Sequence, residues 1–203
     1  MPKDMEVDRM VENLTIYSEE LESGKVYKDC IIVAGDEPFR FHDMQFHSCQ
    51  FQADYCNRSE MINTTFHNCD FSNIEFDDSY FVNVEFNQSK FLNTSLYRTM
   101  IKDVRFQGCM MRMVNLSSSK QEHVSYNSSM LQDATFLEVK HKRVSFNECS
   151  IEGISFQDTI MKGIDLSSCQ FTNITYSPNL IKGLKLSAHQ ALNLIESMGI
   201  IID

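Results

Sequence analysis

The sequence has few glycines and prolines, no surplus of positive charge and no long apolar run. Its 203 residues include only 7 Gly and 3 Pro, so we expect few tight turns or flexible linkers. There are 18 Lys and Arg against 28 Asp and Glu, a formal net charge of −10. A general nucleic-acid-binding protein needs excess positive charge, so that class is disfavoured. No run of about 18 apolar residues occurs, so no membrane-spanning helix is expected.

Signatures of secretion and of catalysis are also missing. The N-terminal stretch MPKDMEVDRM is charged and lacks the apolar core of a signal peptide. We therefore expect a cytoplasmic protein whose 7 cysteines stay reduced. There is no glycine-rich phosphate loop, nucleophile elbow, HExxH or CxxC motif. The sequence thus predicts no enzyme activity, no cofactor and no metal.

What the sequence has instead is a five-residue repeat. In FHNCDFSNIEFDDSYFVNVEFNQSKFLNT, residues 66–94, Phe recurs at every fifth position. From Phe41 to Leu186 every position ending in 1 or 6 is apolar, with Cys56, Gln121 and His141 as exceptions. The positions two residues earlier are all small or β-branched from Ser59 to Ile174. A period of five fits neither a helix nor a flat strand and predicts an uninterrupted solenoid with two inward positions per unit.

The unit CDFSN at Cys69–Asn73 resembles the repeat of the pentapeptide-repeat family. The resemblance implies an all-β fold, a right-handed quadrilateral β-helix in which four units close one coil. Residues twenty apart then lie above one another, and one inward column contains Cys49, Cys69, Cys109, Cys149 and Cys169, with Ser89 and Ser129 between them. We interpret this column as small packing residues, because a metal needs several ligands converging on one point. On an outward column His47 and His67 are expected to be solvated neighbours.

Both ends of the chain depart from the repeat. Residues 1–38 are acidic, and we expect an N-terminal cap with an irregular first coil whose five-residue spacing is kept by Val11, Ile16, Leu21, Val26 and Ile31. The turn AGDEP joins it to the β-helix of residues 39–186. In residues 187–203, Ser187 and Gln190 form a capping-box pattern before a short amphipathic helix, and a short strand of isoleucines follows Gly199.

The apolar surface of this C-terminal segment exceeds what a cap needs. We therefore expect a homodimer joined end to end through Leu192, Ile195, Met198, Ile200 and Ile202. The alternative is that these side chains only seal the last coil of their own chain.

The tail SPNLIKGLKLSAHQALNLIESMGIIID, Ser177–Asp203, resembles the C-terminal end of Qnr-type quinolone-resistance proteins, especially the chromosomal ones of Gram-positive bacteria. The resemblance implies a cytoplasmic dimeric rod that binds DNA gyrase or topoisomerase IV, partly as a DNA mimic, and protects it from quinolones. It implies no direct binding of nucleic acid. Some members carry protruding loops that matter for protection. This chain has none within its repeats and in that respect resembles the loop-free members.

Charge is unevenly spread along the repeat. Between Ser59 and Ser89 the charged residues are all acidic: Glu60, Asp70, Glu75, Asp77, Asp78 and Glu85. The twenty-residue stacking predicts ion pairs of Asp78 with Arg58 and Arg98, of Glu85 with Arg105 and of Asp70 with Lys90. No base lies twenty residues from Glu75 or Asp77. We expect the partner-binding residues to be Glu75 and Asp77 first, then Asp70 and Glu85.

A second face is basic, with Lys102, Lys120, Lys140, Lys142, Arg143, Lys162 and Lys182 set against Asp103 and Glu122. The polar core positions Gln121 and His141 are expected beneath it. This face either touches an acidic part of a partner or carries solvated lysines. Two other functions stay open at this point: a structural or adaptor solenoid with another protein partner, and immunity to a peptide toxin that targets gyrase.

Overall fold

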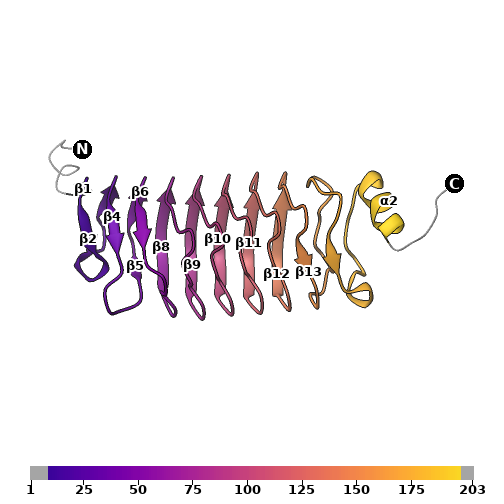
Figure 1. The fold of residues 1–203 in the computed structure, drawn as a ribbon, viewed down its shortest axis with the longest axis horizontal. Coiled ribbons are helices and arrows are strands. Elements are labelled where there is room, and N and C mark those ends of the chain that lie inside the picture. The colour runs from indigo at the N-terminus through magenta and orange to yellow at the C-terminus, as the bar shows by residue number, and fades with distance from the viewer. Residues whose placement is uncertain (1–8, 198–203) are drawn as a thin grey trace.

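The computed structural model describes residues 9–197 and shows a rod of stacked coils (Figure 1). Nine parallel strands form the main sheet: β1 (Met10–Glu12), β3 (Val26–Lys28), β5 (Arg40–His42), β6 (Gln45–His47), β8 (Glu60–His67), β9 (Tyr80–Asn87), β10 (Met100–Gln107), β11 (Lys120–Asn127) and β12 (Lys140–Asn147). A second sheet contains β2 (Thr15–Tyr17), β4 (Ile31–Val33) and β7 (Gln50–Gln52), and a third pairs β13 (Ser155–Phe156) with β14 (Thr175–Tyr176).

Three short helical segments complete the fold: the 3-10 turns η1 (Ser18–Glu20) and η2 (Pro178–Leu180), and the helix α2 (Ala188–Ser197), which lies at the C-terminal end of the rod (Figure 1). Residues 41–186 contain no α-helix, as the repeat predicted. Within residues 9–197 no helix is both long and apolar enough to cross a bilayer.

The coils stack in the twenty-residue register that the repeat predicts. Phe66 pairs with Phe86, and Phe86 with Phe106. On the other sides of the coil single parallel bridges continue the same spacing, as from Asp70 to Lys90. The fold is therefore the quadrilateral β-helix expected from the sequence.

The core consists of rings that stack along the rod axis. One column runs through Tyr27, Phe46, Phe66, Phe86, Phe106, Tyr126 and Phe146, with successive ring centroids 5.0 to 5.3 Å apart. The small or β-branched positions are buried beside the rings, and their hydroxyl and thiol groups bond to backbone carbonyls, as Thr64 Oγ1 does to Phe41 O at 3.1 Å. Every fifth side chain is thus buried because each side of the square coil contributes one large group to a common core.

The corners of the coils require a backbone conformation that the five-residue pattern did not reveal. From Arg58 to Gly163, every residue whose number ends in 3 or 8 has a positive φ, near +55° at most of them, for example Asn63 at 51° and Asn73 at 63°. This left-handed region is most accessible to Gly, Asn and Asp. The asparagines also bond to each other along the corner, with Asn83 Nδ2 donating to Asn63 Oδ1 at 2.9 Å.

The register of the first coils differs from the prediction. Val26 and Ile31 were expected to face inward, but they are only half-buried, whereas Tyr27 and Ile32 lie in the core. The strands β3 and β4 pair with β6 and β7 at a spacing of nineteen residues, one fewer than in the regular coils. They therefore stack on the regular coils in a register shifted by one residue, whereas Ile16 on β2 keeps the expected inward position.

The last coils are less well covered than the pattern predicted. The expected inward residues Phe171, Tyr176, Ile181 and Leu186 are half-buried, unlike their counterparts in the middle of the rod. The coils beside them carry fewer strand pairings, because β12 is the last long strand. In its place the helix α2 packs on this end, with Leu194 only 9% exposed.

Candidate functional site: an acidic belt and a helical end

The six carboxylates between Ser59 and Ser89, here called the acidic belt, lie on neighbouring coils. Parallel pairing places Asp70 between Gln50 and Lys90. It places Glu75 between Tyr55 and Ser95. The belt therefore faces side chains that are distant in sequence, and these decide how much of its charge is neutralised.

Most belt carboxylates meet a base from an adjacent coil. Lys90 Nζ lies 3.7 Å from Asp70 Oδ2. Ion pairs also join Arg105 to Glu85 and Arg40 to Glu60. The predicted pairs of Asp70 and Glu85 are confirmed.

Asp78 has the best-defined partner of the belt. Arg98 donates from Nε to Oδ1 at 2.7 Å and from Nη2 to Oδ2 at 2.5 Å. The bond from Arg98 lowers the pKa of the Asp78 carboxyl, and the nearby charge of Arg58 adds a smaller effect in the same direction. The predicted position of Asp78 between two arginines is confirmed, although only Arg98 makes the ion pair.

Glu75 and Asp77 make no ion pair within residues 9–197, as the sequence predicted. Asp77 nevertheless has a partner that the twenty-residue comparison missed. Ser95 Oγ donates to Asp77 Oδ1 at 2.5 Å, across eighteen residues. A hydroxyl leaves the carboxylate charge in place, so these two residues are the uncompensated part of the belt.

Tyr55 stands beside this uncompensated spot. It bridges to Glu75 through the backbone and its side chain is 72% exposed. An exposed tyrosine is a typical anchor of a protein interface. The repeat pattern alone did not single out Tyr55. The feature of the sequence that could have identified it is an aromatic residue at an outward position of the repeat.

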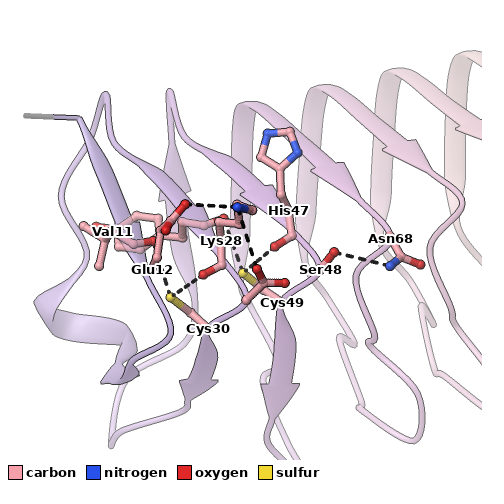
Figure 2. Close-up of polar contacts among 10 residues, drawn as sticks. Val11, Glu12, Lys28, Cys30, His47, Ser48, Cys49 and Asn68 are labelled. Carbon is pink, nitrogen blue, oxygen red and sulfur yellow. Dashed lines mark hydrogen bonds and ion pairs between the residues drawn. The ribbon is translucent and has the colours of Figure 1, made fainter. Parts of the chain in front are cut away.

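The thiol column plays a structural part. Cys49 Sγ donates to the carbonyls of Tyr27 and His47 at 3.4 and 3.5 Å, and Cys30 makes the same kind of bond (Figure 2). Burial raises the pKa of the Cys109 thiol to about 12, which opposes formation of a reactive thiolate. Within the described residues no three His, Cys, Asp or Glu side chains converge as metal ligands.

His47 and His67 stack face to face, with centroids 4.8 Å apart and planes 9° from parallel. Burial and the neighbouring His67 lower the pKa of His47, so this ring is neutral at pH 7. Two stacked rings supply too few ligands to hold a metal firmly.

The predicted capping box of the C-terminal helix is present. Gln190 N donates to Ser187 Oγ at 3.3 Å, and Ser187 N donates to Gln190 Oε1 at 2.8 Å. Gln190 Nε2 also bonds to the carbonyls of Leu166 and Cys169. The side chain of Gln190 on α2 therefore satisfies backbone carbonyls in the last coils of its own chain.

Part of α2 also faces outward. Leu192 is 45% exposed and Ile195 is half-buried. The other expected dimer residues, Met198, Ile200 and Ile202, lie outside the described part of the chain. The exposed Leu192 is consistent with a contact to a second copy, and the dimer stays a prediction.

Residues 79–156 match the family model described as pentapeptide repeat region. No curated protein matches the sequence significantly. Among solved structures, full-length QnrB1, a plasmid-mediated fluoroquinolone resistance protein, is similar with a TM-score of 0.50 and 16% identity, over 94% of this chain and 100% of that chain. A trypsin-treated variant of QnrB1 gives 0.50 and 16%, over 96% and 99%.

The structure of HetL, a pentapeptide repeat protein involved in heterocyst differentiation regulation from the cyanobacterium Nostoc sp. strain PCC 7120, is also similar. It gives a TM-score of 0.45 and 11% identity, over 87% of this chain and 84% of that chain. The match to the family model over residues 79–156 confirms the resemblance to pentapeptide-repeat proteins. The similarity to QnrB1 is one of fold.

Proposed function

We propose, on the premise that the chain is a pentapeptide-repeat β-helix, that it binds a bacterial type II DNA topoisomerase and protects that enzyme from quinolones. The target is DNA gyrase or topoisomerase IV, at a surface that otherwise contacts DNA. The observation that carries the proposal is the similarity in fold to QnrB1 along that protein's whole length. The tail Ser177–Asp203 supports it through its resemblance to Qnr-type proteins.

The charge of the rod makes a limited contribution to this binding. Duplex DNA carries one negative charge per about 1.7 Å of axis, so two coils correspond to roughly six phosphates. The acidic belt supplies carboxylates at a similar density, but Asp70, Asp78 and Glu85 are paired with bases. The unpaired Glu75 and Asp77, with Tyr55 beside them, are therefore the residues we assign to the contact.

The proposed assembly is a homodimer joined through the C-terminal ends. The helix α2 ends the rod and exposes Leu192 there. A two-fold contact at this end would make one rod of twice the length, with the two acidic belts on either side of the centre.

The test is a supercoiling assay with purified gyrase, relaxed plasmid and increasing amounts of the protein. We expect inhibition of supercoiling at high concentration and, at lower concentration, less quinolone-stabilised cleavage. The double variant Glu75→Lys with Asp77→Lys should weaken inhibition with little loss of stability, because neither residue has an ionic partner and only the bond from Ser95 to Asp77 is lost. A matched control, Asp36→Lys with Glu37→Lys in the exposed loop between β4 and β5, makes the same change of charge away from the belt.

The two double variants separate specific contact from net charge. Equal inhibition by the belt variant and by the unmodified protein would remove Glu75 and Asp77 from the interface. Equal weakening by both variants would indicate general electrostatics. No effect of the unmodified protein on gyrase or topoisomerase IV would leave an adaptor solenoid with another partner as the better account.

A further inference from the structure

A groove runs along the basic face of the rod, at the end of the long-stranded sheet. It consists of two adjoining hollows of about 730 and 260 Å³, which share Lys120, Lys140 and His141 in their linings. Lys162 lines the larger hollow and Lys102 the smaller one. We call this surface the basic groove.

The groove exists because the regular stacking stops at this point. The inward column that passes through Ile101 continues with Gln121 and His141 instead of apolar residues. Gln121 is buried, but His141 is only half-buried and its Nε2 lies 2.5 Å from the carbonyl oxygen of Ile160. The main sheet ends with β12, and Ile160 on the next coil is 60% exposed. A polar ring at a core position thus coincides with an opened edge between two coils.

The lysines of the groove lie close enough to repel one another. Lys120 and Lys140 are direct neighbours in the parallel pairing of β11 and β12. Like charges directly opposite one another destabilise a sheet. Lys142 has a partner, Glu122, with Nζ and Oε1 2.7 Å apart. In the described part of the chain no ion pair is formed by Lys102, Lys120, Lys140 or Lys162.

In the part of the chain that the structure describes, Glu138 and Asp158, which also line the groove, form no ion pair with these lysines. Glu138 Oε2 accepts a bond from Ser118 Oγ at 3.2 Å, and Asp158 Oδ1 accepts one from Ser177 Oγ at 2.9 Å. A hydroxyl leaves a carboxylate its charge, so the lining holds five lysines (102, 120, 140, 142 and 162) against the carboxylates of Glu122, Glu138 and Asp158. The groove is therefore a local excess of positive charge on a protein whose net charge is −10. An anionic ligand would relieve the repulsion between its lysines.

We propose that the basic groove binds an extended acidic segment of a partner protein, with Asp or Glu side chains on the lysines and an aliphatic side chain against Ile160. The lysines at 102, 120, 140 and 162 follow one another by one coil each, so they span roughly 14 Å. That length corresponds to about four or five residues of extended chain. The exposed Ile160, with Met100 at the other end of the groove, offers apolar contacts that a free inorganic anion would not use.

A nucleic acid fits this groove less well. The overall charge of −10 repels a polyanion as long as DNA or RNA. The lining also has no Phe, Tyr or Trp ring on which a base could stack, and the ring of His141 is bonded to the Ile160 carbonyl. A short acidic peptide feels mainly the local lysines, because salt screens charges beyond about 10 Å.

The experiment measures fluorescence anisotropy of a fluorescein-labelled ten-residue peptide of glutamates with leucine at every third position. The same peptide with glutamine in place of glutamate, a fluorescein-labelled oligothymidylate and unlabelled inorganic phosphate as a competitor are the other probes. We expect saturable binding of the acidic peptide that weakens with salt, no binding of the glutamine peptide and weaker binding of the oligonucleotide. Phosphate at millimolar concentration should compete only weakly.

The variant Lys120→Glu with Lys140→Glu should weaken peptide binding by at least about tenfold. Its control is Arg9→Glu with Arg112→Glu, which changes the charge equally at two exposed arginines outside the groove lining. Circular dichroism checks that each variant is folded. If the charge reversal disturbs folding, the milder variant Lys120→Gln with Lys140→Gln replaces it, and it should also weaken peptide binding.

Three results would overturn the proposal: no binding of the acidic peptide, equal binding by the groove variant and its control, or tighter binding of the oligonucleotide at the same lysines. The test needs no topoisomerase and is independent of the proposed function. The belt variant Glu75→Lys with Asp77→Lys should bind the peptide as the unmodified protein does, so failure at one surface is distinguishable from failure at the other.

Discussion

A polar pair inside the apolar core gives the sharpest test of how the rod is stabilised. Tyr126 is fully buried, Gln121 is 2% exposed, and Tyr126 Oη donates to Gln121 Oε1 at 3.1 Å. Gln121 Nε2 in turn donates to the buried Ser119 Oγ at 3.1 Å. Burial raises the pKa of the Tyr126 phenol, so the hydroxyl stays protonated and remains a donor.

Removing one member of this pair leaves the other unsatisfied in the core. Tyr126→Phe strips Gln121 Oε1 of its donor and should cost about 1 to 3 kcal/mol of unfolding free energy. Gln121→Leu should lower the unfolding free energy by at least as much, because the hydroxyls of Tyr126 and Ser119 both lose their hydrogen bond to the Gln121 amide. Once Gln121 is leucine, however, Tyr126→Phe should cost nothing further or recover stability, since it removes an unpaired hydroxyl.

The assay is urea unfolding of the four proteins of this double-mutant cycle, followed by circular dichroism. The predicted coupling between Gln121 and Tyr126 is about 1 to 3 kcal/mol. A double variant whose loss equals the sum of the two single losses would refute the reasoning, because it would mean that the two side chains share no bond that matters to stability.

Three further predictions concern the corners, the ring column and pH. Met113 is 54% exposed at a corner with φ +56°, so Met113→Asn should raise the urea midpoint by an amount equivalent to about 1 kcal/mol; a fall would refute the corner argument. Phe86 is stacked on both faces whereas Phe81, equally buried, is not, so Phe86→Leu should cost about 1 to 2 kcal/mol more than Phe81→Leu in thermal unfolding. Arg98 lowers the pKa of Asp78 below its usual 3.8, so the ionised carboxylate stabilises the fold above about pH 4 and loses this effect as the pH falls through the lowered pKa; Asp78→Asn should be the less stable protein at pH 7, by a difference that shrinks as the solution is acidified, and a constant difference would contradict this.

The repeat itself could be read from the sequence because burial imposes it at every unit. A large side chain is needed once per side of each coil, so Phe41 to Leu166 are spaced with no slip and the core column follows directly. The same reasoning failed before Phe41, where a spacing of nineteen residues to the next coil places Tyr27 and Ile32 in the core. A change of one residue in the spacing leaves no mark in the apolar pattern when Val26 and Tyr27 are both acceptable inside.

The candidate surfaces were less predictable, since they depend on which outward side chains meet. Twenty-residue stacking gave the partners of Asp70, Asp78 and Glu85, because those contacts follow the backbone register. It missed the bond from Ser95 to Asp77, which crosses the coil diagonally. The sequence predicted the basic face with Gln121 and His141 beneath it, but not the hollow in that face, because the hollow arises where the regular stacking ends.

The most direct test of the proposed function is competition between this protein and DNA for gyrase. Purified gyrase is first bound to a fluorescently labelled duplex, and release of the duplex is followed by anisotropy as the unlabelled protein is added. The account predicts displacement of the duplex, with the Glu75→Lys and Asp77→Lys double variant displacing it less effectively than the Asp36→Lys and Glu37→Lys control. Full retention of the duplex at tens of micromolar protein, with gyrase and with topoisomerase IV alike, would contradict it.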